Sequence, residues 1–146
     1  GYLSLQLTAK ATGGHSSMPD KETSVDILSQ ALVKLRSNPF PAKFTEPMEG
    51  LMKAVGPNMP FVQKMAFANP WLFKGLIVKS YEQSGAGNAM LHTTLVPTII
   101  EAGIKDNVIP SQAKATINLR LLPGDAPEAT LEKVKSIIND ERVTVT

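Results

Sequence analysis

Residues 113–121 have the sequence AKATINLRL, in which apolar and polar side chains alternate at every position. A period of two is that of a β-strand with one buried face, so we expect a strand from Ala113 to Leu121. The same alternation places Arg120 on the polar face of the strand, away from the core. Pro123 and Gly124 follow and end the strand.

Three further strands are predicted around this one. Leu3 to Thr8 alternates in the same way, Thr93 to Ile100 is rich in β-branched residues, and a last strand begins near Arg142. Because proline cannot donate a backbone hydrogen bond, Pro97 predicts that the second of these strands lies at an edge or contains a bulge.

Two amphipathic helices are predicted between the strands. Thr23 and Asp26 have the spacing of a capping box, and the helix that they begin ends at Asn38–Pro39. The second helix follows Asp125, a candidate N-cap with Glu128 three residues on. The apolar stripes consist of Val25, Leu28, Leu32 and Leu35 in the first helix and Leu131, Val134, Ile137 and Ile138 in the second.

The segment 40–90 differs from the rest of the chain, because it is rich in proline and methionine and contains short helix-like pieces. We interpret it as a mostly helical insertion between the first helix and the second strand, closed by a flexible turn at residues 84–88. Its bulky residues are expected to form a local core; the alternative is an adaptable apolar wall over a hydrophobic group of a substrate. The aromatic residues concerned include Phe61, Phe67, Trp71 and Phe73.

Without the insertion, the order of elements is strand, helix, strand, strand, helix, strand. This order predicts an α+β fold, the ferredoxin-like two-layer sandwich (βαββαβ), with a four-stranded antiparallel sheet and two helices on one face. The other face of the sheet, or an edge strand, is then available to a partner. We expect residues 1–146 to form one domain of this kind.

The composition argues against several classes of function. Fifteen basic and 13 acidic residues give a net charge of only +2, so a nucleic-acid partner is not expected. The absence of cysteine excludes disulfides and thiolate metal sites. No apolar run approaches the roughly 20 residues that cross a bilayer, so no membrane partner is expected, while the compartment stays open. Strand-like patterns at both ends suggest a segment of a longer protein.

The chain has few residues of the kind that carry catalytic chemistry. Its two histidines, His15 and His92, lie far apart and have no neighbouring metal-ligand motif, so we expect no metal site and no activity in this chain alone. His15 follows two glycines in a loop, where it could donate to an oxyanion or simply be a surface residue. Asn107 fits an ordinary turn, and Arg120 is either a solvated charge or a ligand for a carboxylate. His92 is expected to be an ordinary surface or half-buried histidine.

Three short motifs follow one another along the chain. They are Gly13-Gly14-His15-Ser16-Ser17-Met18-Pro19, then Asn107-Val108-Ile109-Pro110, then Ala115-Thr116-Ile117-Asn118-Leu119-Arg120-Leu121-Leu122-Pro123-Gly124. In this order they resemble the dimerisation domain of the M20 metallopeptidase family. The resemblance covers essentially the whole chain, and the long insertion between the first two motifs is most similar to the subgroup that contains vacuolar carboxypeptidase S and the related N-fatty-acyl-amino-acid hydrolase.

The resemblance implies that this domain is a lid and a homodimer contact for a larger domain that carries two zinc ions and a glutamate general base. By the same resemblance, His15 would stabilise the oxyanion in the partner subunit's site, and Asn107 would bind substrate. Arg120 would bind the carboxylate of the substrate. The implied reaction is hydrolysis of an amide next to a free carboxylate, in a peptide C-terminus or an N-acyl amino acid.

Two other functions stay open at this point. The chain could be a non-catalytic ferredoxin-like module that dimerises or binds a small ligand. It could also come from a relative that has lost its zinc ligands and keeps the lid for assembly.

Overall fold

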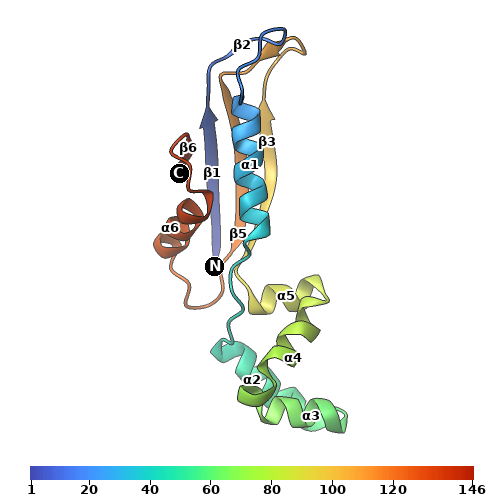
Figure 1. Ribbon diagram of the computed structural model, residues 1–146. Helices are drawn as coiled ribbons and strands as arrows, with labels where there is room; N and C mark the ends of the chain where they lie inside the picture. Colours follow the sequence, from blue (N-terminus) through green and yellow to red (C-terminus); the bar gives the residue numbers. More distant parts are fainter. The chain divides into compact units, whose positions relative to one another are not determined.

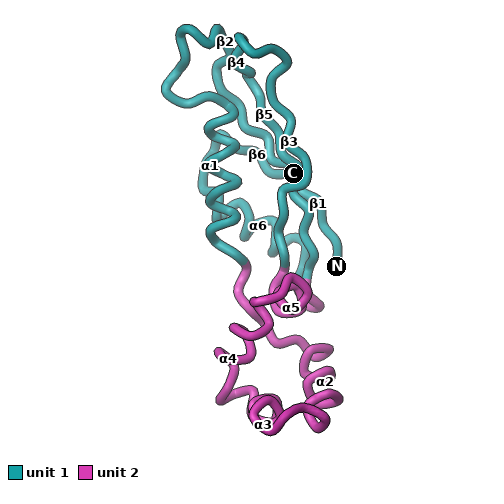
Figure 2. Tube along the Cα trace, turned by 90° about the vertical axis from the view of Figure 1, so that its right-hand side faces the viewer, with its two compact units in different colours: residues 1–39, 94–121, 125–146 teal, residues 40–93, 122–124 magenta.

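The computed structural model describes residues 1–146, which divide into two compact units (Figure 2). The sheet unit consists of residues 1–39, 94–121 and 125–146. The helical unit consists of residues 40–93 and 122–124. Each unit is described separately below.

The sheet unit contains a four-stranded antiparallel sheet in the order β3-β5-β1-β6 (Figure 1). Its strands are β1 (Tyr2–Lys10), β3 (Thr94–Ala102), β5 (Gln112–Arg120) and β6 (Val143–Val145). The first and third strands in chain order are central and the other two are edges. This is the arrangement that the ferredoxin-like fold requires, so the predicted fold class is confirmed.

The central pair of strands is held in register by its apolar residues. Leu5 of β1 lies opposite Ile117 of β5, and Leu7 lies opposite Ala115. All four side chains are buried, because in a strand the alternate positions share one face. The alternation found in the sequence of both strands is therefore the alternation of the folded sheet.

Helices α1 (Ser24–Ser37) and α6 (Pro127–Ile138) cover the buried face of the sheet (Figure 1). The capping box of α1 is confirmed, since the Thr23 side chain accepts from the Asp26 backbone N–H and the Asp26 carboxylate accepts from the Thr23 backbone N–H. The predicted stripe of α1 is partly wrong: Val25 is 40% exposed. The residues of α1 that are buried are Ser24, Ile27, Leu28, Ala31 and Leu35.

The start of α6 also differs from the prediction. Its N-cap is Ala126 and no side chain caps it, so Asp125 does not play the predicted role. Pro127 instead occupies the first helical position, where a fixed φ favours the helix and the missing N–H has no cost. Asn139 follows the helix as its C-cap, and its φ of 44° is in the left-handed region. Val134 and Ile138 of the predicted stripe are buried.

Strand β3 is an edge strand with an irregularity. Its register against β5 shifts between Pro97 and Ile99, as the proline predicted. Val96, Ile99 and Ile100 are exposed along the strand. An edge with free backbone groups and apolar side chains is available for pairing with another chain.

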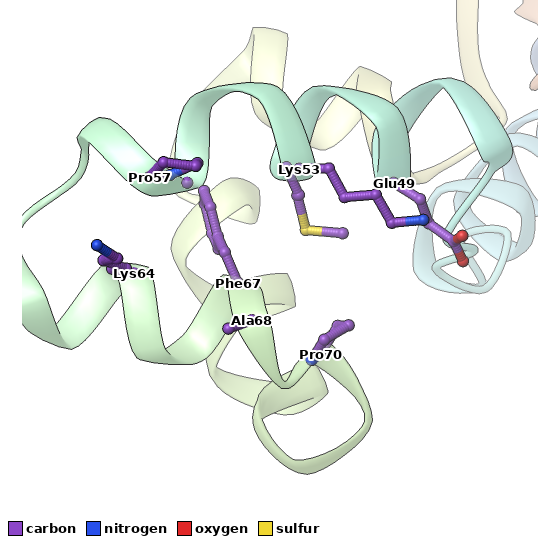
Figure 3. Close-up of a pocket in the computed structure, with 9 residues that line it drawn as sticks. Glu49, Lys53, Pro57, Lys64, Phe67, Ala68 and Pro70 are labelled. Carbon is purple, nitrogen blue, oxygen red and sulfur yellow. The ribbon is translucent and has the colours of Figure 1, made fainter.

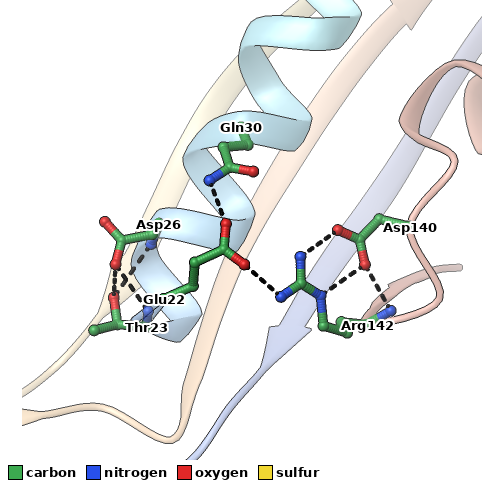
Figure 4. A network of polar contacts seen from close by, with 6 residues as sticks. All are labelled: Glu22, Thr23, Asp26, Gln30, Asp140 and Arg142. Atoms are coloured by element: carbon green, nitrogen blue, oxygen red, sulfur yellow. Dashed lines mark hydrogen bonds and ion pairs between the residues drawn. The ribbon is translucent and has the colours of Figure 1, made fainter. Parts of the chain in front are cut away.

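A polar network joins the start of α1 to the segment before β6 (Figure 4). The Arg142 guanidinium donates to both carboxylate oxygens of Asp140, at 3.0 and 2.8 Å, and to Glu22 at 2.8 Å. Gln30 of α1 also donates to Glu22. The hydrogen bonds from the Arg142 side chain and backbone lower the pKa of Asp140 to about 2.

The helical unit contains α2 (Glu46–Val55), a 3-10 turn (Gly56–Asn58), α3 (Phe61–Ala68), α4 (Pro70–Glu82) and α5 (Gly85–Leu91). It has a core of its own, made of Met48, Met52, Ala66, Ile77 and Leu91. The turn predicted at residues 84–88 is wrong. That segment begins α5, because the Ser84 hydroxyl accepts from the Gly87 N–H and caps the helix.

The aromatic residues of the helical unit behave in two ways. Phe67 and Phe73 are partly buried against the core, as expected. Phe61 and Trp71 are 78% and 79% exposed, so the prediction that they belong to a local core is wrong.

None of the helices described above combines the length and the apolar character that a membrane-spanning helix needs.

Candidate functional site

Two of the three residues predicted to act on a substrate lie side by side in the sheet unit. His15 belongs to β2 (Gly14–His15), which pairs with β4 (Val108–Ile109) in a two-stranded ribbon. His15 lies opposite Val108, and the Ser16 N–H donates to the Asn107 carbonyl at 3.3 Å. The structure thus brings His15 and Asn107 together from distant parts of the sequence.

A glycine allows the two segments of this ribbon to approach each other. A Cβ atom at Gly13 would lie 3.0 Å from the Ile109 carbonyl oxygen and 3.2 Å from the Ser111 nitrogen. These are backbone atoms, which cannot move aside as the end of a flexible side chain can. A side chain at position 13 would therefore crowd the opposite backbone, which favours glycine just before His15.

The side chains of His15 and Asn107 are both exposed. Neither makes a hydrogen bond or an ion pair within the chain. The imidazole and the carboxamide are therefore both available to a group outside the domain. A histidine and an asparagine on one ribbon can both donate hydrogen bonds to an oxygen that carries negative charge.

Arg120 lies at the last position of β5, between Tyr2 of β1 and Thr94 of β3. Its guanidinium carbon is 5.0 Å from the centroid of the Tyr2 ring, a cation–π contact. No carboxylate of the chain pairs with it. The exposed guanidinium group stacks on an aromatic ring and can still bind a carboxylate through two parallel hydrogen bonds.

Tyr2 is a neighbour of the candidate residue Arg120 that the sequence did not identify. Its contact with Arg120 follows from the register of β1 on β5, in which Tyr2 lies directly opposite Arg120. Strand register between distant segments has no local signal in a sequence. The only available hint was that both residues fall at the polar positions of alternating segments.

The two parts of the candidate site lie at opposite ends of the sheet (Figure 1). The ribbon with His15 follows the Lys10 end of β1, which pairs with Gln112, whereas Arg120 is eight residues further along β5. At about 3.4 Å per residue, the two groups are separated by at least about 27 Å. One small substrate cannot contact both of them in one copy of the domain.

The residues of this chain do not fit a metal centre. No group of three or more His, Cys, Asp and Glu side chains converges anywhere in the structure. His92 is nearly buried in the helical unit, where its ring nitrogens contact the Phe40 carbonyl at 2.6 Å and the Glu82 carboxylate at 3.0 Å. It holds the ends of that unit together and is a structural residue. This chain provides no cluster of ligands for the two zinc ions that the resemblance implies for a separate, larger domain.

The helical unit contains a cavity of about 470 Å³ between α2 and α3, which none of the predicted site residues lines (Figure 3). Phe67 projects between the two helices, and Lys53 and Lys64 lie on either side. The cavity is lined by Glu49, Met52, Lys53, Gly56, Pro57, Lys64, Phe67, Ala68 and Pro70.

The geometry can be compared with known proteins. The family model described as the peptidase dimerisation domain of the M20 family matches residues 1–145. The chain belongs to this family. The predicted resemblance is therefore confirmed at the level of the family and the fold.

Several curated relatives are similar to this dimerisation domain. The human N-fatty-acyl-amino acid synthase/hydrolase PM20D1 is 40% identical over 144 residues, which are 98% of this chain and 29% of the relative. The probable carboxypeptidase S-like 2 of Dictyostelium discoideum is 38% identical over 99% of this chain and 28% of its own length. Carboxypeptidase S of Saccharomyces cerevisiae is 26% identical over 83% of the chain and 22% of its own. The domain thus spans less than a third of these relatives.

Solved structures show the same fold. An M20 family metallo-carboxypeptidase from Sulfolobus solfataricus aligns with 99% of the domain and 42% of its own chain, with a TM-score of 0.61 and 17% identity. Human carnosine dipeptidase 1 aligns with 100% of the domain and 35% of its own chain, with a TM-score of 0.60 and 13% identity. The fold is therefore shared with a metallo-carboxypeptidase and a dipeptidase of low sequence identity.

Proposed function

We propose that this domain is the lid and dimer contact of a zinc-dependent hydrolase that cleaves an amide bond next to a free carboxylate. The substrate would be a peptide C-terminus or an N-acyl amino acid. The observation that carries the proposal is Arg120, an exposed guanidinium that no carboxylate of the chain neutralises and that the Tyr2 ring orients. A planar fork of this kind fits a carboxylate better than an ammonium group does.

The substrate class follows from this group together with the relatives. Arginine at the end of β5 would hold the carboxylate of an amino-acid portion by two charge-assisted hydrogen bonds. The relatives are an N-fatty-acyl-amino acid synthase/hydrolase and a carboxypeptidase, and the substrates that these names describe present a free carboxylate beside an amide. A hydrophobic acyl group or peptide side chain on the other side of the amide agrees with both names.

His15 would provide the second function of the lid. When an amide carbonyl is attacked, its oxygen becomes negatively charged, and a fixed donor near that oxygen lowers the barrier. The exposed imidazole of His15, with the Asn107 amide beside it on the ribbon, provides such donors. The metal and the nucleophile would belong to residues outside this chain, so we expect the isolated domain to be inactive.

The separation of at least about 27 Å implies that the two functions serve different active sites. In a homodimer, Arg120 would close over the active site of its own subunit while His15 and Asn107 reach the active site of the partner subunit. Each site would then be complete only in the dimer, which explains why a lid and a dimer contact are combined in one domain.

The dimer contact would form at the edge strand β3. Ile100 is 62% exposed on that strand, and Val33 of α1 is 64% exposed. Arg36, one turn from Val33, donates to the Leu95 carbonyl at 3.0 Å, so this side of α1 lies along β3. Pairing of two β3 edges would extend the sheet across the dimer and bury both apolar groups.

The test is hydrolysis by a longer protein that contains this domain and a zinc-binding domain, on N-acyl amino acids and dipeptides with zinc present. We expect Arg120→Ala to raise KM for substrates with a free carboxylate and to leave KM for the corresponding methyl esters unchanged. Arg120→Lys, the matched control, keeps the charge but not the fork, and should recover only part of the binding. Equal effects on acids and esters would exclude carboxylate binding by Arg120.

A non-catalytic module is the alternative, since the chain has no metal ligands of its own. Failure to find zinc-dependent hydrolysis with any member of the substrate panel would favour that alternative.

A further inference from the structure

Helices α3 and α4 expose an unusual number of large apolar side chains. Single exposed hydrophobic residues are common on protein surfaces, but a contiguous group of them marks a binding surface. We call this group the α3–α4 apolar face. Its members, with their exposed fractions, are Phe61 (78%), Val62 (64%), Met65 (41%), Trp71 (79%), Leu72 (60%) and Leu76 (56%).

These side chains form one surface. Phe61 and Met65 are four residues apart on α3, and Leu72 and Leu76 are four apart on α4, so each pair lies on one side of its helix. The exposed side chains of the two helices meet, because Val62 of α3 and Leu76 of α4 line the same open cavity of about 320 Å³. The apolar face therefore continues from one helix to the next.

The charges on the segment that carries this face are mostly positive, with Glu49 and Glu82 at its two ends. Residues 50–81 contain no Asp or Glu and include four lysines, at positions 53, 64, 74 and 79. Three of them belong to α3 and α4. Lysine side chains can lie along an apolar surface while the ammonium group reaches outward to a negatively charged layer.

We propose that the α3–α4 apolar face docks on an anionic lipid surface. Bulky apolar residues, a tryptophan and an excess of lysine over acidic residues are the combination that places short helices in the interface of a bilayer. Neither helix crosses the bilayer, in agreement with the absence of a membrane-spanning helix. This revises the expectation, drawn from the sequence, that the chain has no membrane partner, and it goes beyond the proposed hydrolase function.

The chemistry of the face favours lipid over the other partners that an apolar surface could have. A second copy of the same face would bring like charges together, which opposes self-association. The indole ring of Trp71, which is 79% exposed, is unfavourable in water but favourable at the boundary between acyl chains and headgroups.

Trp71 is the single tryptophan of the chain, so its fluorescence reports on this face alone. We would titrate the 146-residue chain with vesicles of phosphatidylcholine, with and without phosphatidylserine, and measure Trp71 emission and co-sedimentation. We expect a blue shift and binding with phosphatidylserine, weaker binding without it, and loss of the difference at high salt. Brominated lipids should quench Trp71.

Variants test the residues that carry the proposal. Phe61→Ser and Leu72→Ser keep the fluorescent probe, and each should weaken vesicle binding roughly ten-fold. Lys64→Glu, on α3, should weaken binding only to vesicles with phosphatidylserine. Ile104→Ser is the matched control, because Ile104 is 93% exposed but lies in the sheet unit, and binding should not change. Circular dichroism checks that each variant is folded.

Three outcomes would overturn the proposal. The first is no change in Trp71 emission with either kind of vesicle. The second is vesicle binding that Phe61→Ser and Leu72→Ser leave unchanged, because another surface would then be responsible. The third is a blue shift that depends on protein concentration in the absence of lipid and accompanies dimer formation in sedimentation, which would assign the face to a second copy of the chain.

Discussion

A mixture of two inactive variants should recover activity if His15 and Arg120 serve different active sites. The variants are His15→Ala and Arg120→Ala, each made in a longer, zinc-dependent protein that contains this domain. Their two side chains are separated by at least about 27 Å along the sheet, which no N-acyl amino acid or dipeptide headgroup spans. One subunit therefore cannot use both on the same substrate.

The expected losses of the single variants follow from the groups removed. Deleting an oxyanion donor lowers turnover by roughly 100- to 1000-fold, so His15→Ala should reduce kcat. Deleting a charge-assisted fork should cost about 3 kcal/mol, or roughly 100-fold in KM, so Arg120→Ala should weaken carboxylate binding. Both homodimers should then be nearly inactive at low substrate concentration.

The mixed dimer is the informative species. Random exchange of equal amounts gives about half heterodimers, and each heterodimer has one site with an intact Arg120 and an intact partner His15. About a quarter of all sites are then complete, so activity should return to about a quarter of the wild-type value. The assay is turnover after subunit exchange, compared with the same mixture assayed before exchange. Activity that stays at the level of the two homodimers would refute the assignment of the two residues to different sites.

Four further results are expected. Tyr2→Leu should raise KM for carboxylate substrates roughly three-fold without changing kcat, because it removes only the cation–π contact that orients the arginine fork; an unchanged KM would show that the ring has no positioning role. Ile100→Lys should convert the dimer to monomer in analytical ultracentrifugation, whereas Ile104→Lys should not. Ile117→Ala should lower the free energy of unfolding by about 2–5 kcal/mol in urea titrations, since this central side chain is fully buried. The pKa of Asp140 is about 2 in the folded state and below its ordinary value, so its stabilising effect is present above about pH 4 and is lost as the pH falls toward 2; Asp140→Asn should flatten acid unfolding in that window.

The regular parts of the sheet unit could be predicted because their signals are local. The strands around Leu5 and Ile117 alternate in the sequence as they do in the fold, and the Thr23 capping box involves residues three apart. The bulge at Pro97 follows from a missing N–H. Each of these features depends on covalent neighbours or on a simple period.

The errors arose where tertiary contacts decide the structure. The glycines near Ser84 predict a flexible turn, but a Cβ at Gly87 would collide with the Tyr81 carbonyl, so this glycine permits close packing of α5 on the end of α4. The prediction that Phe61 and Trp71 belong to a core is wrong because composition alone does not distinguish a buried aromatic residue from an exposed one.

The candidate site could be predicted only in part. His15, Asn107 and Arg120 were identified through the resemblance to a family, since each has an ordinary structural explanation in the sequence. That His15 and Asn107 share a ribbon, and that Tyr2 lies over Arg120, depends on pairing between distant segments. Such pairings require the register of the folded sheet.

Strand β5 couples two properties that many proteins can change separately. Its odd positions, such as Ile117, fill the core, and its even positions end in Arg120 on the open side. The deletion of one residue within β5 would exchange the two faces, exposing the core residues and turning Arg120 inward. We therefore expect this strand to tolerate substitutions but not insertions or deletions, whereas the helical unit, which has a core of its own, can change in length without altering the register of the sheet.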